Sequence, residues 1–190
     1  MKTEPHSGAS HSSTQSCSSA DALQLRTFRP GDETAFRELN VAWITRHFRL
    51  EEADLQILGD PRTHILDRGG EICIAQIEGR IVGCCALLPI ASGEFEVGKM
   101  AVAEEMRGRG IGRRMLLFTI AHARKIGAHR LYLESSSRLP SALHIYEAAG
   151  FRHLSPAQRK PSKYDRADVF MELLLTPSAD TPVWPVDRYK

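Results

Sequence analysis

The chain has 190 residues, a formal net charge of +2, and hydrophobic and charged fractions of 42% and 25%. A 150-residue core of this kind can bury ~70% of the surface of its unfolded chain, so a single domain with tails is expected. The small charge does not favour a nucleic-acid partner, and the longest apolar run, 81–91, is too short to cross a bilayer.

The two ends of the chain differ in composition from its middle. Residues 1–20 are rich in serine and poor in apolar residues, which predicts a disordered leader without the apolar segment of a secretory signal. Residues 177–190 are rich in proline and are expected to form an extended tail. Residues 21–176 are therefore expected to form the folded domain.

Strands and helices alternate through this domain. The apolar patterns predict strands at 23–29, 71–78, 80–88, 94–102, 130–134 and 167–175. They predict helices at 33–46, 50–58, 111–126 and 140–150, the first of them capped by Asp32. Early strands followed by one strand–helix–strand crossover indicate an α/β (α+β) domain with a mixed sheet flanked by helices.

The four cysteines show no metal-binding or redox spacing, and neither do the histidines, so no metal is expected. Cys84 and Cys85 are neighbours in a predicted strand, so their side chains should point to opposite faces. Together with Cys73 they are expected to be small buried hydrophobes. This use of cysteine favours a reducing, cytoplasmic location.

The most informative segment is a basic loop with three alternate glycines, which leads from a predicted strand into a predicted helix. Glycines let successive main-chain N–H groups point at one small volume, and the helix adds the unpaired donors of its first turn. The glycines are Gly108, Gly110 and Gly112, and the surrounding cations are Arg107, Arg109, Arg113 and Arg114. A diphosphate is the ligand that suits this arrangement best.

Two other phosphate-binding loops fit less well. A P-loop needs lysine followed by serine or threonine after its last glycine, whereas Arg113 and Arg114 follow Gly112. A dinucleotide loop needs a different glycine spacing, although Glu134 lies near the distance expected for its carboxylate. Taken alone, the loop leaves a phosphate site and a plain strand–helix turn as equal alternatives.

Two ordered motifs are similar to those of the GCN5-related N-acetyltransferase (GNAT) superfamily. Arg107-Gly108-Arg109-Gly110-Ile111-Gly112 resembles the acetyl-CoA loop Arg/Gln-x-x-Gly-x-Gly/Ala, and Tyr146-Glu147-Ala148-Ala149-Gly150-Phe151 resembles a Tyr-x-x-x-Gly-Phe helix end. The resemblance covers about 23–175. It implies a mostly antiparallel, twisted sheet whose two central strands splay apart to leave a slot for the pantetheine arm.

The resemblance also implies an N-acetyltransferase with acetyl-CoA as cosubstrate and Tyr146 as the acid that protonates the leaving thiolate. A tyrosine packed in the core is the competing interpretation. The implied cofactor-binding residues are Met100, Ala101, Val102, Arg107, Gly108, Arg109, Gly110, Ile111, Gly112, Arg113, Ser135, Ser141 and Tyr146. Ser135 and Ser141 stand where many relatives have an asparagine, and the shorter reach of serine puts that contact in doubt.

A carboxylate must accept the proton of the acceptor ammonium, because only the neutral amine attacks a thioester. Glu96 is expected to be this general base, since strand alternation places it on one face with Gly98, Met100 and Val102. Many members of the resembled family have a glutamate here. An ordinary ion-paired carboxylate is the alternative, and Glu94 and Glu134 are the next candidates.

The acceptor site is expected to be formed by the segments 43–58 and 154–166. Their arginines and lysines could hold a carboxylate, which favours a small-molecule amine such as an amino acid. A protein N-terminal or lysine acetyltransferase is the alternative within this chemistry, and a non-catalytic CoA-binding sensor or interaction module is the alternative from another class. We expect no nucleic-acid or membrane partner, and the sequence leaves a homodimer open.

Overall fold

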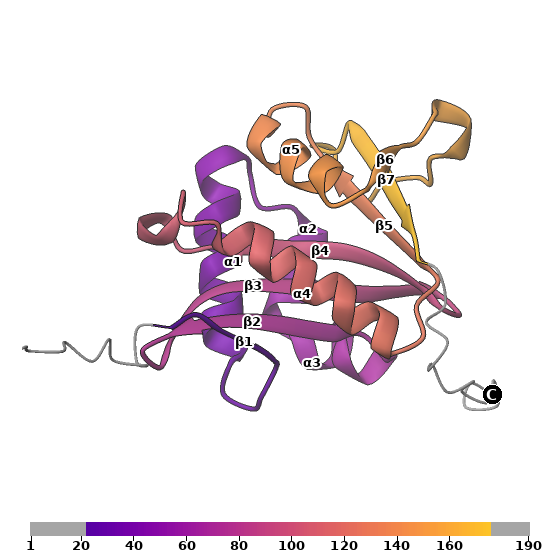
Figure 1. Cartoon of the computed structure of the whole chain (residues 1–190). Coiled ribbons are helices and arrows are strands. Elements are labelled where there is room, and N and C mark those ends of the chain that lie inside the picture. Colours follow the sequence, from indigo (N-terminus) through magenta and orange to yellow (C-terminus); the bar gives the residue numbers. More distant parts are fainter. Residues whose placement is uncertain (1–21, 176–190) are drawn as a thin grey trace, which may run out of the picture.

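The computed structural model describes residues 22–175, which form a seven-stranded sheet covered by helices on both faces (Figure 1). The strand order is β1-β2-β3-β4-β5-β7-β6, and the β4–β5 pair is parallel among otherwise antiparallel neighbours. The predicted mixed, mostly antiparallel sheet is thus confirmed. The expected leader and tail, and Cys17, lie outside the described residues.

The predicted elements agree closely with those observed. The strands are β1 (Gln24–Thr27), β2 (Glu71–Ile77), β3 (Arg80–Ala91), β4 (Glu94–Val102), β5 (Arg130–Ser135), β6 (Arg152–His153) and β7 (Val169–Leu174). The helices are α1 (Glu33–His47), α2 (Glu52–Gly59), α3 (Pro61–His64), α4 (Ile111–Lys125) and α5 (Pro140–Ala148). The short α3 and β6 were not predicted. Within residues 22–175, no helix has the length and apolar character needed to span a membrane.

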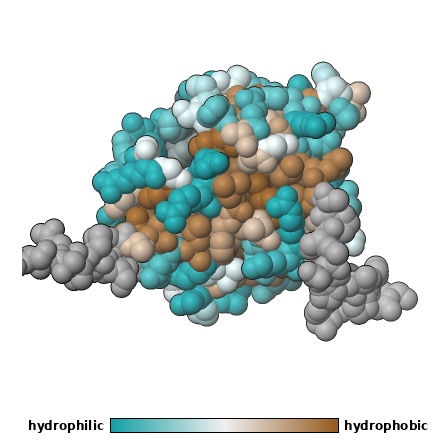
Figure 2. All heavy atoms as spheres, in the orientation of Figure 1, coloured by the Kyte–Doolittle hydropathy of each residue, from teal (hydrophilic) through white to brown (hydrophobic). Residues whose placement is uncertain are grey.

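Two hydrophobic cores lie on the two faces of the sheet. One joins α4 to the sheet through Met115, Leu116 and Ile120, and the other joins α1 through Phe36 and Ile44. Cys85 belongs to the first core and Cys84 to the second, which confirms that their side chains point to opposite faces. Apolar surface also remains visible around α4 (Figure 2), where Leu117 and Ile126 are exposed.

The predicted cap of the first helix is wrong in one respect. Asp32 precedes α1, but its carboxylate makes no capping hydrogen bond. It instead accepts hydrogen bonds from the Arg26 guanidinium, at 2.6 and 2.9 Å, and from the main-chain N–H of Arg29, at 2.7 Å. The charged partner on β1 competes successfully for the carboxylate, because a bidentate hydrogen bond between charged groups is stronger than a neutral cap.

A β-bulge interrupts β4 near its middle. Gly98 pairs with Ala86 and Ala101 pairs with Cys84, so two residues of β4 stand opposite one residue of β3. Lys99, the first of these two, has a φ of 49°, which is left-handed and unusual for a residue other than glycine.

The bulge changes which side chains of β4 share a face. Ala101 joins the core on the α1 side, whereas Met100 and Val102 pack against the core on the α4 side. Glu96 lies on the α1 side with Gly98, since a Cβ on Gly98 would lie 3.3 Å from the Glu96 carboxylate. The expectation that Glu96 shares a face with Met100 and Val102 is therefore wrong, because the extra residue reverses the alternation.

The two central strands separate just before the bulge. β4 pairs with β5 from Glu94–Arg130 to Glu96–Tyr132 and no further, while β5 remains paired with β7 up to Ser135. Figure 1 shows β4 and β5 close together at one end and diverging toward the other. The gap between them is the slot that the resemblance implied.

Candidate active site

The basic loop lies at the start of α4, beside the wide end of this gap. Gly108 and Gly110 have φ values of 75° and 72°, and a Cβ on either would meet no atom within 4 Å. Glycine is therefore required there for its left-handed backbone, not to avoid a clash in the protein itself. At Gly112, by contrast, a Cβ would lie 3.4 Å from the end of Met100.

The loop presents main-chain donors together with positive charge. The N–H of Arg114 makes the first helical hydrogen bond, to Gly110, so the N–H groups of the three preceding residues have no partner within the helix. Within residues 22–175, four cations of this region form no ion pair: Arg107, Arg109, Arg113 and Arg114. Such a loop fits a phosphate group.

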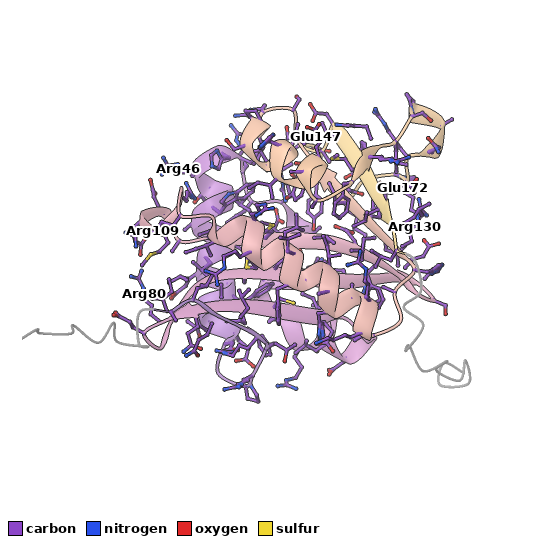
Figure 3. All side chains as sticks on the ribbon, in the orientation of Figure 1. Arg46, Arg80, Arg109, Arg130, Glu147 and Glu172 are labelled. Atoms are coloured by element: carbon purple, nitrogen blue, oxygen red, sulfur yellow. The ribbon has the colours of Figure 1, made fainter. Side chains whose placement is uncertain are left out.

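Other arginines of this end of the molecule are already paired. Arg46 pairs with Glu104 and Arg80 with Glu105. Figure 3 shows Arg46, Arg80 and Arg109 at one end of the molecule, far from the ion pair of Arg130 and Glu172 at the other. The arginines around the loop thus keep their charge free of a carboxylate partner, unlike Arg46 and Arg80 nearby.

A pocket opens where β4 and β5 part. Its walls come from α1, β4, β5, α5 and the segment before β7, so the two segments expected to form the acceptor site do meet there. It is lined by Asn40, Trp43, Ile44, Phe48, Glu96, Val97, Gly98, Lys99, Met100, Glu134, Ser135, Ser136, Leu139, Tyr146, Tyr164, Arg166 and Ala167.

Glu96 is the carboxylate at the narrow end of the gap. Burial and the neighbouring Glu134 raise its pKa to about 7, although Lys99 and Lys163 act in the opposite direction. A carboxyl group with this pKa exchanges its proton near neutral pH, as a general base must. The two other candidates differ: Glu94 does not line the pocket and pairs with Arg130 and Lys160, whereas Glu134 does line it.

Glu134 lies on β5, two residues beyond the partner of Glu96. Burial raises its pKa, and it accepts a hydrogen bond from the Ser162 hydroxyl. Tyr132 stands opposite Glu96 in the sheet register, two residues before Glu134, and its hydroxyl is buried. The charge of Glu134 therefore disfavours the ionisation of Glu96.

A buried ionic cluster forms the wall next to Glu96. Asp54 of α2 is 0% exposed and accepts hydrogen bonds from Lys99 at 2.7 Å and from Arg166 at 2.7 and 2.8 Å. Lys99 also donates to the Tyr164 hydroxyl at 2.6 Å, and Arg166 also donates to Glu51 at 2.7 Å. These contacts tie the segment before β7 to α2 across the pocket.

Tyr146 reaches the pocket from the opposite face of the sheet. It packs against the α4-side core and meets Phe151 edge-on, with 6.1 Å between ring centroids. Burial raises the pKa of its hydroxyl well above the usual range, so the group is a proton donor at neutral pH. It therefore has both properties that the sequence suggested, a core contact and access to the pocket.

The two predicted serines differ in position. Ser135 lines the pocket at the end of β5, whereas Ser141 is exposed in the first turn of α5 and is not among the lining residues. Asp54, Lys99 and Arg166 were not singled out from the sequence. Asp54 did carry a signal, because it falls four residues from both Leu50 and Leu58, on the inward stripe of its helix.

Comparison with known proteins gives one family. The model described as "Acetyltransferase (GNAT) family" matches residues 32–151. An IAA acetyltransferase of Azospirillum brasilense is 32% identical over 120 residues, which cover 63% of this chain and 72% of that protein. YjgM of Escherichia coli, described as an uncharacterized N-acetyltransferase, is 32% identical over 87 residues, or 44% of this chain and 52% of that one. The chain thus spans about half the length of YjgM.

Solved structures share the fold. A GNAT-family acetyltransferase from Staphylococcus aureus superimposes with a TM-score of 0.73 at 20% identity, covering 82% of this chain and 100% of that chain. The acetyltransferase yncA from Salmonella typhimurium, solved with acetyl-CoA, gives a TM-score of 0.63 at 20% identity, over 86% and 99% of the two chains.

Proposed function

The chain belongs to the GNAT family of acetyltransferases, and from this premise we propose that it transfers the acetyl group of acetyl-CoA to the primary amine of a small molecule. The proposed reaction is direct: the amine attacks the thioester, the carbon–sulfur bond breaks, and no covalent enzyme intermediate forms. Glu96 accepts the proton of the amine and Tyr146 donates one to the departing thiolate.

The loop and the open edge of β4 fit acetyl-CoA, which supplies the acetyl thioester. The first-turn N–H groups of α4 and the unpaired arginines are suited to the diphosphate. Beyond Glu96, the edge of β4 that faces β5 has no strand partner in the part of the chain that the structure describes. Main-chain groups of Met100, Ala101 and Val102 are thus available to an extended amide chain, in the manner of an added strand.

The two proton-transfer groups lie on opposite faces of the sheet at the gap. Glu96 approaches from the α1 side and Tyr146 from the α4 side. A thioester held in the gap would have the base on the acceptor side and the acid on the side of the sulfur. This arrangement separates the two proton transfers, so neither group has to serve both steps.

One observation carries this proposal: the gap between β4 and β5 joins the glycine loop at its wide end to Glu96 at its narrow end. The test is a thiol-release assay with acetyl-CoA and a panel of small amines and peptides, with calorimetry of acetyl-CoA binding. We expect thiol release with small amines. Binding without release on any acceptor would contradict an enzyme, and release with peptides alone would indicate a protein acetyltransferase.

A further inference from the structure

The charged side chains of the acceptor pocket limit which amines it can bind. We propose that the acceptor is a primary amine on an apolar or aromatic body without an acid group, and that Glu134 is a specificity-determining residue that selects its positive charge. The inference rests on the proposed function. The sequence suggested an amino acid, because arginines and lysines of the segments 43–58 and 154–166 could hold its carboxylate. In the folded protein the cations that line the pocket are not free to do so.

The cations that line the pocket are already bound. Lys99 and Arg166 share the buried carboxylate of Asp54, and Arg166 also pairs with Glu51. An acceptor carboxylate could draw either cation away only by taking one of the two partners of the buried Asp54 carboxylate. Removing one member of a buried ion pair is strongly unfavourable. Neither cation is therefore available to an acid group of the substrate.

Most basic residues of the segment 154–166 also have interaction partners already. Arg159 lies over the ring of Phe170, 5.2 Å from its centroid, and Lys160 pairs with Glu94. Lys163 is exposed, forms no ion pair among the described residues, and acts on the pKa values of both pocket glutamates. It is not one of the residues lining the pocket. Arg138, 4.9 Å from the centroid of the Phe48 ring, also stands outside the lining. An acid group inside the pocket would therefore find neither Lys163 nor Arg138 among the lining residues.

The pocket-lining charged side chains that lack an ion pair are acidic. Glu96 and Glu134 both line it, and within residues 22–175 neither forms an ion pair. The Ser162 hydroxyl donates a hydrogen bond to Glu134. An ammonium group placed between them would relieve their mutual repulsion, whereas a second carboxylate would add to it.

The remaining walls suit a hydrocarbon or aromatic body. Aromatic side chains line the pocket on several sides: Trp43, Phe48, Tyr146 and Tyr164. Aromatic faces attract cations as well as apolar groups, and Lys99 and Arg166 already lie 4.4 and 4.3 Å from the Tyr164 centroid. The pocket therefore combines apolar contact with negative charge, which is the complement of an amine lacking an acid group.

Matched pairs of acceptors test this directly, each pair consisting of an amino acid and the amine left when its α-carboxylate is removed. Suitable pairs are phenylalanine with phenethylamine, lysine with cadaverine, and arginine with agmatine. We expect kcat/KM for the amine to exceed that for the amino acid by roughly 10- to 100-fold, because like charges at an interface are strongly unfavourable. Equal values, or a preference for the amino acids, would overturn the inference and leave the acetyltransferase proposal intact. Turnover of neither member would contradict both.

A variant of Glu134 and a matched control at Glu94 test which residue causes the preference for the amine. Glu134→Gln should reduce the preference for the amine within each pair by roughly tenfold, since it removes one of the two negative charges. Glu94→Gln removes a carboxylate near the narrow end of the same gap but outside the pocket, and it should leave the preference unchanged. Thermal melts of both variants establish that they are folded. An unchanged preference in Glu134→Gln would exclude Glu134 as the selecting residue.

Discussion

The arginine loop and the acceptor pocket lie at the two ends of one gap and are built in different ways. The loop is exposed and uses main-chain N–H groups and unpaired arginines. The pocket is formed by side chains from distant parts of the chain, and its two cations are paired with the carboxylates of Asp54 and Glu51. Under the proposed function, the loop would hold the cosubstrate through its backbone, and the pocket would select the acceptor through its side chains.

The largest effect is expected at the pocket, from Glu96→Gln. An amide cannot accept the amine proton, so kcat/KM should fall by roughly 10²–10⁴-fold. Acetyl-CoA affinity, measured by calorimetry, should remain unchanged, because the loop is untouched. Glu94→Gln serves as the control and should keep most of the activity. Near-normal turnover of Glu96→Gln would mean that another group or water is the base.

Asp54→Ala should strongly affect stability. Its loss would leave Lys99 and Arg166 without their buried partner, which costs about 3–5 kcal/mol in the free energy of unfolding. Urea denaturation measures this, with Glu52→Ala on the exposed side of the same helix as the control. A loss below about 1 kcal/mol, typical of surface ion pairs, would show that the cluster is not essential to the pocket wall.

Tyr146→Phe tests whether Tyr146 is the general acid. We expect kcat to fall roughly 10- to 100-fold, near the low end for general acids because a thiolate is already a good leaving group. The core contact with Phe151 is kept, so thermal stability and acetyl-CoA affinity should change little. Unaltered kcat would assign Tyr146 to the core alone.

Gly110→Val tests the loop. A branched side chain at a φ of 72° costs roughly 1–2 kcal/mol, so acetyl-CoA binding should weaken by roughly 5- to 30-fold as the loop changes conformation. Gly127→Val places the same strain at the other end of α4, at a φ of 83°. That control should lose stability without losing affinity. Equal affinities of the two variants in calorimetry would argue against the loop as the phosphate site.

The smallest expected effect is a shift in the pH dependence of activity. Glu96 must be ionised to act as a base, so activity should rise with pH through its pKa of about 7. Glu134→Gln removes a like charge, which lowers that pKa and moves the rising limb to lower pH by roughly half to one unit. The same amine is used in both profiles, so its own titration cancels. A shift to higher pH would mean that Glu134 does not act on Glu96 through its charge.

The sequence predicted those parts of the fold that depend on local patterns. The bounds of β4 and the start of α4 were right, because alternation and a left-handed glycine are properties of short segments. The face of Met100 and Val102 was wrong, because a bulge at Lys99 has no reliable local signal. The Asp32 cap failed for a related reason: the competing Arg26 lies on another element.

For the site, the sequence alone determined the glycine loop, the two proton-transfer candidates and the family they resemble. Only the tertiary structure decided that Lys99 and Arg166 are paired with Asp54 and Glu51, and that Glu134 acts on Glu96. The physical reason is the separation along the chain of the residues that determine each feature. A loop conformation and a helix end are specified within a few residues, whereas the charge of a pocket is the sum over side chains that meet only when the chain has folded.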